Sequence, residues 1–264
     1  MTILDTIIAK KRQEVEQAKA TLSITDLERK PLFSRACFSL REFVLSPGKN
    51  GIIAEYKRAS PSKGIINDRS PVEEVVAGYQ AAHVSAVSVL TDSEFFSGSL
   101  NDLTAARDAL LIPLLRKEFI IDEYQLFEAK AHGADVILLI AAVLRPSEIK
   151  SLSETAQSLG LSVLLEVHGH DELDRSIMDS VDAIGVNNRN LKDFTVSLEH
   201  SLGLADSIPD RFIKVSESGI SNAATIKRLR QAGFQAFLIG ENFMKTGDPA
   251  QAIQHFVASL QSSD

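Results

Sequence analysis

The 264-residue sequence contains a single cysteine, Cys37. One thiol cannot form an internal disulfide, which is typical of a protein from a reducing compartment. A chain of this length buries about three quarters of its unfolded surface, so it needs no disulfide to fold. No reactive motif surrounds Cys37, and we expect a small packed residue there rather than a nucleophile.

Long hydrophobic runs are also missing. The longest uninterrupted apolar run, Val136–Leu144, has nine residues, whereas a membrane helix needs roughly 20. The N-terminus does not resemble a signal peptide, because Asp5 interrupts its apolar residues and the basic segment Lys10–Arg12 follows them instead of preceding them. The sequence therefore predicts a cytoplasmic protein without a membrane segment.

The sequence has fewer basic residues than acidic ones. Lys and Arg total 28 while Asp and Glu total 35, which gives a net charge of −7 at pH 7. This balance argues against a broad nucleic-acid-binding face and against a polybasic patch for a membrane surface. It leaves room for a small anionic ligand held by a few local cations. His168 and His170 are the only close histidine pair, and we expect structural or loop residues there rather than metal ligands.

The sequence changes character near residue 51. Residues 1–20 show the apolar period of an amphipathic helix, and residues 21–50 are predicted to be irregular. From residue 51 on, short apolar runs alternate with longer amphipathic stretches, a pattern typical of buried parallel strands separated by helices. Eight such runs are present, at 51–57, 86–91, 112–119, 135–141, 162–168, 183–189, 212–217 and 236–240.

Helix start signals lie between these runs. Ser70 followed by Pro71 predicts a serine N-cap with proline in the first turn, and Arg145-Pro146 and Ser221 predict two further helix starts. Eight strand–helix units predict an α/β protein, a (β/α)8 TIM barrel over residues 51–264 behind an N-terminal helical extension over residues 1–50, in one structural domain. A doubly wound open sheet is the alternative. It needs fewer strands and a glycine-rich first turn that this sequence lacks.

The carboxyl ends of the predicted strands carry many charged and amide side chains, and a barrel has its chemistry at these ends. Alternation along a strand places Glu55 and Lys57 on one face, and likewise Asn187 and Arg189. Isolated buried charges are costly, so a convergent site explains the pattern better than independent rim charges do. The predicted cluster comprises Glu55, Lys57, Lys117, Glu166, Asn187, Arg189 and Glu217.

A phosphate site is predicted beside this cluster. Ser218-Gly219 follows the seventh predicted strand and Gly240 follows the eighth. In barrels these two loops often hold phosphate on backbone N–H groups and on a helix N-terminus. The loop after the first predicted strand adds the hydroxyl group of Ser60 and the cation of Lys63.

These residues lie in recognisable motifs. Segment 53–64, IAEYKRASPSKG, resembles the signature of the indole-3-glycerol-phosphate synthase family. The similarity extends over nearly the whole chain, with further motifs in the same order at 115–122 (LRKEFIID), 165–168 (LEVH), 185–191 (GVNNRNL), 216–220 (SESGI) and 238–240 (LIG).

The resemblance implies an enzyme, a carbon–carbon lyase of tryptophan biosynthesis. That family converts 1-(2-carboxyphenylamino)-1-deoxyribulose 5-phosphate to indole-3-glycerol phosphate, with release of CO₂ and water and with no cofactor or metal. The resemblance implies Lys117 as the general acid and Glu166 as the catalytic glutamate, with Lys57 as a further acid and Glu55 beside it. A lysine in a dry pocket loses basicity, so we expect lowered lysine pKa values there.

The resemblance also implies binding roles. Asn187 and Glu217 match residues that position the substrate, and Arg189 matches the group that faces its anthranilate carboxylate. Glu241 departs from the pattern, because many members have a small hydroxyl residue there and a carboxylate cannot donate to phosphate. The apolar face of the N-terminal helix is expected to cover the barrel mouth. The implied phosphate contacts are Ser60, Ser218, Gly219 and Gly240.

Two other functions stay open from the sequence. Another phosphosugar barrel, such as a phosphoribosylanthranilate isomerase, would need a Cys and an Asp as its acid–base pair, but Cys37 precedes the barrel. A non-catalytic ligand-binding protein is the second alternative, and the intact set of Lys57, Lys117 and Glu166 argues against it. The expected partner is a phosphosugar–anthranilate small molecule, with no nucleic acid and no membrane. A monomer is expected, with an oligomer left open.

Overall fold

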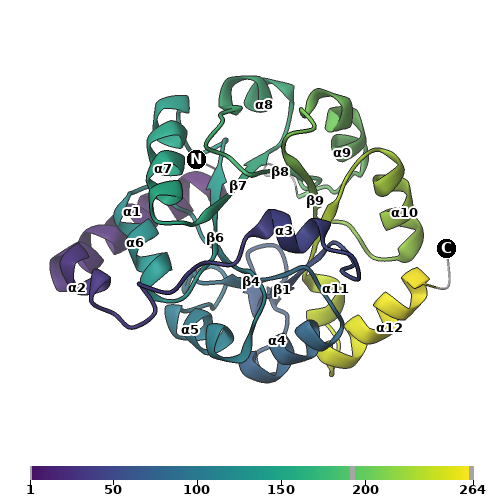
Figure 1. Ribbon diagram of the computed structural model, residues 1–264, viewed down its shortest axis with the longest axis horizontal. Helices are drawn as coiled ribbons and strands as arrows, with labels where there is room; N and C mark the ends of the chain where they lie inside the picture. The colour runs from purple at the N-terminus through teal and green to yellow at the C-terminus, as the bar shows by residue number, and fades with distance from the viewer. Residues whose placement is uncertain (1, 191–193, 262–264) are drawn as a thin grey trace.

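Parallel strands close into a barrel in the computed structural model, which describes residues 2–190 and 194–261 (Figure 1). The closed order β1-β10-β9-β8-β7-β6-β5-β4 confirms the predicted barrel and excludes the doubly wound open sheet. All eight predicted runs contain a strand. The barrel strands are β1 (Ile52–Tyr56), β4 (Ala86–Leu90), β5 (Leu114–Lys117), β6 (Val136–Ile140), β7 (Ser162–Val167), β8 (Ala183–Asn187), β9 (Ile213–Glu217) and β10 (Ala236–Ile239). A short hairpin of β2 (Ala59–Ser60) and β3 (Gly64–Ile65) follows β1.

Helices follow the barrel strands in turn and surround the barrel (Figure 1). Their apolar faces pack on the outward-facing side chains of the strands in one continuous core. Among the described residues, no helix is long and apolar enough to cross a membrane. The surrounding helices are α4 (Val72–Ala81), α5 (Leu100–Ala109), α6 (Tyr124–Ala131), α7 (Pro146–Ser158), α8 (His170–Ser176), α9 (Glu199–Leu204) with the 3₁₀ turn η1 (Ala205–Ser207), α10 (Ala223–Gln231), α11 (Glu241–Met244) and α12 (Pro249–Gln261).

The N-terminal helix is present as predicted, as α1 (Ile3–Thr21). The irregular assignment of residues 21–50 was wrong in two places, where α2 (Ile24–Glu28) and α3 (Leu40–Leu45) form. Each is only about one turn long, too short for a hydrophobic period to show in the sequence. Tertiary contacts stabilise them, because Leu40 and Val44 of α3 pack into the apolar interior of the barrel. Figure 1 shows α3 crossing the barrel next to β1 and β4.

Two predicted helix caps were wrong by one residue, and one was right. Pro71 itself occupies the N-cap of α4, and the hydroxyl group of Ser70 instead accepts a hydrogen bond from Asn67. Asn222, not Ser221, caps α10. Its side chain accepts the hydrogen bond of the third residue of the helix, which either residue type can do. Pro146 begins α7 as predicted.

The alternation of side chains along the strands decides what faces the barrel interior. Ile53, Leu115 and Leu164 belong to the apolar cluster that fills the interior. The residue two positions later on each of these strands points the same way, one layer higher. These residues are Glu55, Lys117 and Glu166, so the sequence pattern itself places their side chains at the upper end of the barrel.

Candidate active site

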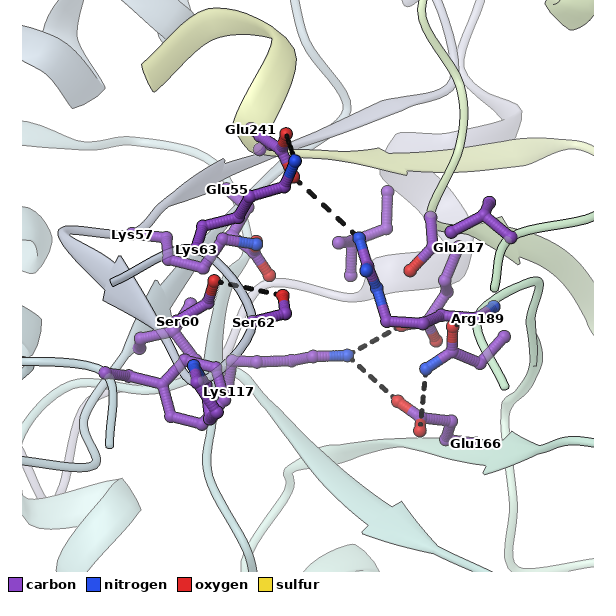
Figure 2. Close-up of a pocket in the computed structure, with 18 of the residues that line it drawn as sticks. Glu55, Lys57, Ser60, Ser62, Lys63, Lys117, Glu166, Arg189, Glu217 and Glu241 are labelled. Carbon is purple, nitrogen blue, oxygen red and sulfur yellow. Dashed lines mark hydrogen bonds and ion pairs between the residues drawn. The ribbon is translucent and has the colours of Figure 1, made fainter. Parts of the chain in front are cut away.

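All eleven residues predicted for the site line one cavity of about 590 Å³ at the carboxyl ends of the barrel strands (Figure 2). The cavity combines a charged floor, a polar rim formed by the loops after β1, β9 and β10, and an apolar wall. The predicted residues that it brings together are Glu55, Lys57, Ser60, Lys117, Glu166, Asn187, Arg189, Glu217, Ser218, Gly219 and Gly240.

Lys117 lies at the centre of the charged floor. Its Nζ is 2.6 Å from Oε2 of Glu217 and 3.1 Å from Oε2 of Glu166 (Figure 2). The other carboxylate oxygen of Glu166 accepts a hydrogen bond of 3.1 Å from Nδ2 of Asn187. Strand register contributes to this arrangement, because Asn187 pairs with Glu217 across β8 and β9. Four strands thus supply one connected set of proton donors and acceptors.

The lowered pKa expected for Lys117 was wrong for the protein without substrate. Burial by itself would lower the pKa of Lys117, but the nearby carboxylates of Glu217, Glu166 and Glu55 outweigh it and raise the pKa above its ordinary value. Desolvation favours the neutral amine only where no anion lies close. Lys117 is therefore held as an ammonium ion that has a proton to donate.

The two carboxylates beside Lys117 differ in their affinity for protons. Burial would raise the pKa of Glu166, yet Lys117, His168 and Asn187 together lower it. Burial raises the pKa of Glu217 to about 7, with Glu166 and Glu55 adding to the effect and Lys117 opposing it. One ammonium group cannot neutralise two buried carboxylates, so one of them retains affinity for a proton. The site therefore holds an ionised and a readily protonated carboxyl group side by side.

Glu55 and Lys57 form a second ion pair, with 2.5 Å between Oε1 and Nζ. Glu55 is buried, and its side chain passes close to the backbone of Gly240. A Cβ atom at residue 240 would lie 2.4 Å from Oε1 of Glu55. A side chain at this position would therefore displace Glu55, which explains the glycine.

The polar rim combines a sharply turned backbone with a carboxylate. Ser218 and Gly219 both have positive φ, 69° and 75°, which turns the chain sharply at the end of β9. The carboxylate of Glu241 lies 3.7 Å from Nζ of Lys63 and 3.8 Å from Nη2 of Arg189. In the free protein, Glu241 is thus the carboxylate that Arg189 faces.

The apolar wall comes partly from the extension. Ile3, Leu4 and Ile7 of α1 line the cavity, as expected for a helix that covers the barrel mouth. Phe96 and Phe119 complete the wall and pack against each other with ring centroids 6.0 Å apart. A planar aromatic group has a place to bind here, next to the charged floor.

The comparisons with known proteins agree with this geometry. The family model described as indole-3-glycerol phosphate synthase matches residues 4–256. The chain belongs to the indole-3-glycerol phosphate synthase family. An indole-3-glycerol phosphate synthase from Bacteroides thetaiotaomicron is 49 % identical over 259 residues, which cover 98 % of this chain and 99 % of that protein. One from a Polaromonas species is 43 % identical over 262 residues, which cover 95 % and 96 %.

Solved structures with low sequence identity share the fold alone. The 3-hexulose-6-phosphate synthase of Salmonella typhimurium superposes with a TM-score of 0.62 at 13 % identity, over 81 % of this chain and all of that one. A chain of the tryptophan synthase complex from Pyrococcus furiosus gives 0.59 at 15 % identity, over 80 % and 98 %. Membership of the synthase family makes this chain a decarboxylating, ring-closing lyase of tryptophan biosynthesis.

The attachment of the N-terminal extension to the barrel was not predicted from the sequence. The buried Nζ of Lys11 lies 3.0 Å from Asp92 and 3.0 Å from Glu118, and 2.6 Å from Glu14. Glu118 directly follows Lys117, so the docking point of α1 is adjacent to the central lysine. The sequence did contain one sign of this contact. Lys11 falls on the apolar stripe of α1, and a charged residue that is buried there needs a partner of opposite charge.

The contacts of His168 were not predicted from the sequence. It was expected to be a structural or loop residue rather than a metal ligand, and in the described part of the chain no three His, Cys, Asp or Glu side chains gather in a way that could hold a metal ion. Its ring nevertheless lies between two carboxylates, Glu166 and Glu172, at 3.5 Å and 3.3 Å. The two-residue spacing of Glu166 and His168 was the signal that could have shown them to share a face, but the contribution of Glu172 from α8 required the fold.

Proposed function

We propose that the cavity binds 1-(2-carboxyphenylamino)-1-deoxyribulose 5-phosphate and that its lysines and glutamates carry the proton transfers that close the indole ring. The contact of Lys117 with both Glu166 and Glu217 is the observation that carries this proposal. It combines a charged acid, an ionised base and a protonatable carboxyl group within hydrogen-bonding distance, which is what acid–base catalysis requires.

In the first stage, Lys117 donates a proton to the ribulose carbonyl oxygen. This makes the carbonyl carbon electrophilic toward the aromatic ring carbon that bears the carboxylate. The new carbon–carbon bond forms, and loss of CO₂ returns the electron pair of the broken bond to the ring system. Lys57, whose ammonium group lines the same cavity, adds positive charge that stabilises the developing negative charge.

In the second stage, a hydroxyl group leaves as water and the indole becomes aromatic. Lys57 donates the proton to the departing hydroxyl group, and Glu55 holds Lys57 in place through their 2.5 Å contact. Glu166 accepts the proton that the ring system must lose. Asn187 keeps the Glu166 carboxylate oriented through its 3.1 Å hydrogen bond, and Glu217 positions the sugar hydroxyl groups.

The two ends of the substrate match the two sides of the cavity. The phosphate group binds at Ser60, Ser218, Gly219 and Gly240, where backbone N–H groups carry the contact next to Glu241. The aromatic ring lies against the apolar wall, and Arg189 turns from Glu241 toward the anthranilate carboxylate. The side chains named here supply every proton and charge that the two stages require.

The extension and the barrel act as one unit in this proposal, because the cavity wall includes residues of α1. We place the protein in the cytoplasm as a monomer. The biosynthetic family and the single cysteine, Cys37, support the compartment. All eleven predicted site residues line one cavity within the chain, so the proposed site needs no residue from a second copy.

A fluorescence assay for indole-3-glycerol phosphate formation tests the proposal. Lys117→Met and Glu166→Gln should each lower kcat by about 10²- to 10⁴-fold, while equilibrium binding of the substrate persists. Lys150→Met, at an exposed lysine of α7, serves as the control and should match the unsubstituted protein. Near-normal turnover in both pocket variants would refute the assigned roles. Binding without turnover in the unsubstituted protein would favour a non-catalytic ligand-binding protein.

A further inference from the structure

His168 occupies an unusual position between two carboxylates. It follows β7 directly and shares the inward face with Glu166, two residues earlier. Its Nδ1 lies 3.3 Å from Oε2 of Glu172, and the same oxygen accepts the backbone N–H of His168 at 2.8 Å. Glu172 belongs to α8, so the strand and the following helix together fix the orientation of the ring.

The second ring nitrogen faces Glu166. Nε2 of His168 is buried, has no hydrogen-bond partner among the described residues, and lies 3.5 Å from Oε1 of Glu166. That oxygen already accepts a hydrogen bond from Asn187, while Oε2 of Glu166 contacts Lys117. Contacts of this kind are often long before substrate binds and shorten in the complex.

The pair of carboxylates determines which protonation state fits the site. A neutral imidazole has one N–H and one lone pair, so it would present a lone pair to one of the two carboxylates. Only the imidazolium ion offers an N–H to each. The charged groups around the ring favour the imidazolium ion. Three carboxylates act on His168 directly: Glu166 on β7, Glu172 on α8 and Glu217 on β9. Two cations act on its partners, Lys117 of β5 on Glu166 and Arg175 of α8 on Glu172. Burial would lower the pKa of His168, but these carboxylates raise it.

We propose that His168, as an imidazolium ion held by Glu172, is a positioning residue for Glu166: its Nε2–H orients the Glu166 carboxylate and keeps it ionised for the step in which it accepts a proton. This inference rests on the proposed role of Glu166. It adds a group that acts only through Glu166 and does not touch the substrate. When His168 loses its proton at high pH, the ring presents a lone pair to either Glu166 or Glu172. In the tautomer whose lone pair faces Glu166, the base loses its orienting donor.

Two substitutions separate the two sides of the ring. His168→Gln places an amide N–H near the position of Nε2 and keeps a neutral donor toward Glu166. His168→Asn places its amide near Nδ1 and keeps only the contact with Glu172. We expect His168→Asn to lower kcat by about 10- to 100-fold with KM nearly unchanged. We expect His168→Gln to retain most of kcat. Because His168 causes the alkaline limb of the kcat–pH profile in this proposal, that limb should be absent from His168→Gln.

A third substitution tests the support from α8. Glu172→Gln removes the carboxylate that stabilises the imidazolium ion, so it should move the alkaline limb to lower pH with little change in the plateau of kcat. His170→Gln is the matched control, because His170 is exposed at the start of α8, and its profile should be that of the unsubstituted enzyme. Circular dichroism spectra and thermal unfolding midpoints identify variants that are folded.

Glu166→Gln separates the proposed role of Glu166 from the proposed role of His168. If Glu166→Gln retains normal turnover, the proposed role of Glu166 fails. If Glu166→Gln is impaired but folded His168→Asn, His168→Gln and Glu172→Gln all keep the normal kcat and pH profile, only the inference on His168 fails. Adding His168→Asn to Glu166→Gln should cause no further loss of residual kcat. An additive loss would show that His168 acts by another route and would overturn the proposal.

Discussion

The ammonium group of Lys117 lies 2.6 Å from the carboxylate of Glu217 at the centre of the barrel mouth, where Glu217 is buried and the Lys117 side chain is only 14 % exposed. Glu166 shares the same ammonium group. Burial, with Glu166 and Glu55 adding to it, raises the pKa of Glu217 to about 7 against the opposing effect of Lys117. The pKa of Glu166 is lowered, because Lys117, His168 and Asn187 outweigh its burial. The protein without substrate thus holds, next to Lys117, a carboxyl group that titrates near neutral pH.

Glu217 should make stability depend on pH. Its pKa is about 7 in the folded protein against an ordinary value of 4.5, so between these values the folded state binds more protons than the unfolded state. The free energy of unfolding therefore falls as pH rises from 4.5 to 7, and Glu217→Gln lacks this contribution. Urea unfolding at several pH values should show the unsubstituted protein losing stability relative to Glu217→Gln across this window, with a constant difference above it.

The control for this experiment is Glu154→Gln, at an exposed carboxylate on α7. It reports the effect of removing a carboxylate outside the cavity. A difference between the unsubstituted protein and Glu217→Gln that stays flat from pH 4.5 to 7, or that grows in favour of the unsubstituted protein, contradicts the assignment of the raised pKa.

Arg189→Ala should weaken substrate binding more than it slows chemistry. The guanidinium group is only loosely held in the free protein, by Glu241 at 3.8 Å and the carbonyl oxygen of Phe194 at 3.5 Å, so it is available to a substrate carboxylate. Loss of a charge-assisted hydrogen bond costs about 1.5–3 kcal/mol, which raises KM by about 10- to 100-fold. Steady-state kinetics should show kcat changed by no more than a few-fold.

Arg189→Lys refines this test, because it retains the charge but loses the planar fork that binds a carboxylate with two parallel hydrogen bonds. Its KM should fall between those of Arg189→Ala and the unsubstituted protein. A large drop in kcat with an unchanged KM in Arg189→Ala would mean that the arginine acts in the chemical step instead.

Glu241→Ser should improve binding of anions at the rim. The carboxylate of Glu241 pairs with both Lys63 and Arg189, so its removal frees two cations and ends its repulsion of the phosphate group. Exposed ion pairs are worth about 0.2–1 kcal/mol each, so the loss of both pairs is expected to lower KM by about 2- to 30-fold. Inhibition by inorganic phosphate should strengthen in parallel.

Glu241→Gln keeps the size of the side chain and removes only its charge. It should change KM in the same direction as Glu241→Ser if repulsion is the cause. A rise of KM in both variants would instead indicate that the carboxylate helps to build the phosphate site.

Lys11→Met should destabilise the protein strongly. The substitution leaves the carboxylates of Asp92 and Glu118, exposed by only 1 % and 4 %, without their shared cation. Removing one partner of a buried ion pair costs about 3–5 kcal/mol. Lys10→Met is the matched control, since Lys10 pairs with Glu94 at the surface and its loss should cost less than about 1 kcal/mol. Chemical denaturation measures both, and equal effects would rule out the buried network as the anchor of α1.

Much of the fold followed from local patterns. Buried parallel strands are continuous apolar runs, and five of the eight runs end in charged residues where the barrel opens, so the strands and the cluster of Glu55, Lys57 and Lys117 were both predictable. The short helices α2 and α3 were not, because one turn of helix shows no period and its stability comes from the surfaces it packs on. The shift of the Lys117 pKa was predicted in the wrong direction, because the distances from Lys117 to the neighbouring carboxylates cannot be derived from the sequence.

The sequence by itself determined the architecture, the list of residues at the mouth and the family, since these depend on residue type, spacing and order along the chain. Only the tertiary structure decided which charges pair: Lys117 with Glu166 and Glu217, Lys11 with Asp92 and Glu118, and His168 with Glu166 and Glu172. The physical reason is the steep dependence of electrostatic energy on distance and burial. Which atoms come within 3 or 4 Å is set by strand register and helix docking, and the chemistry of the cavity follows from those contacts.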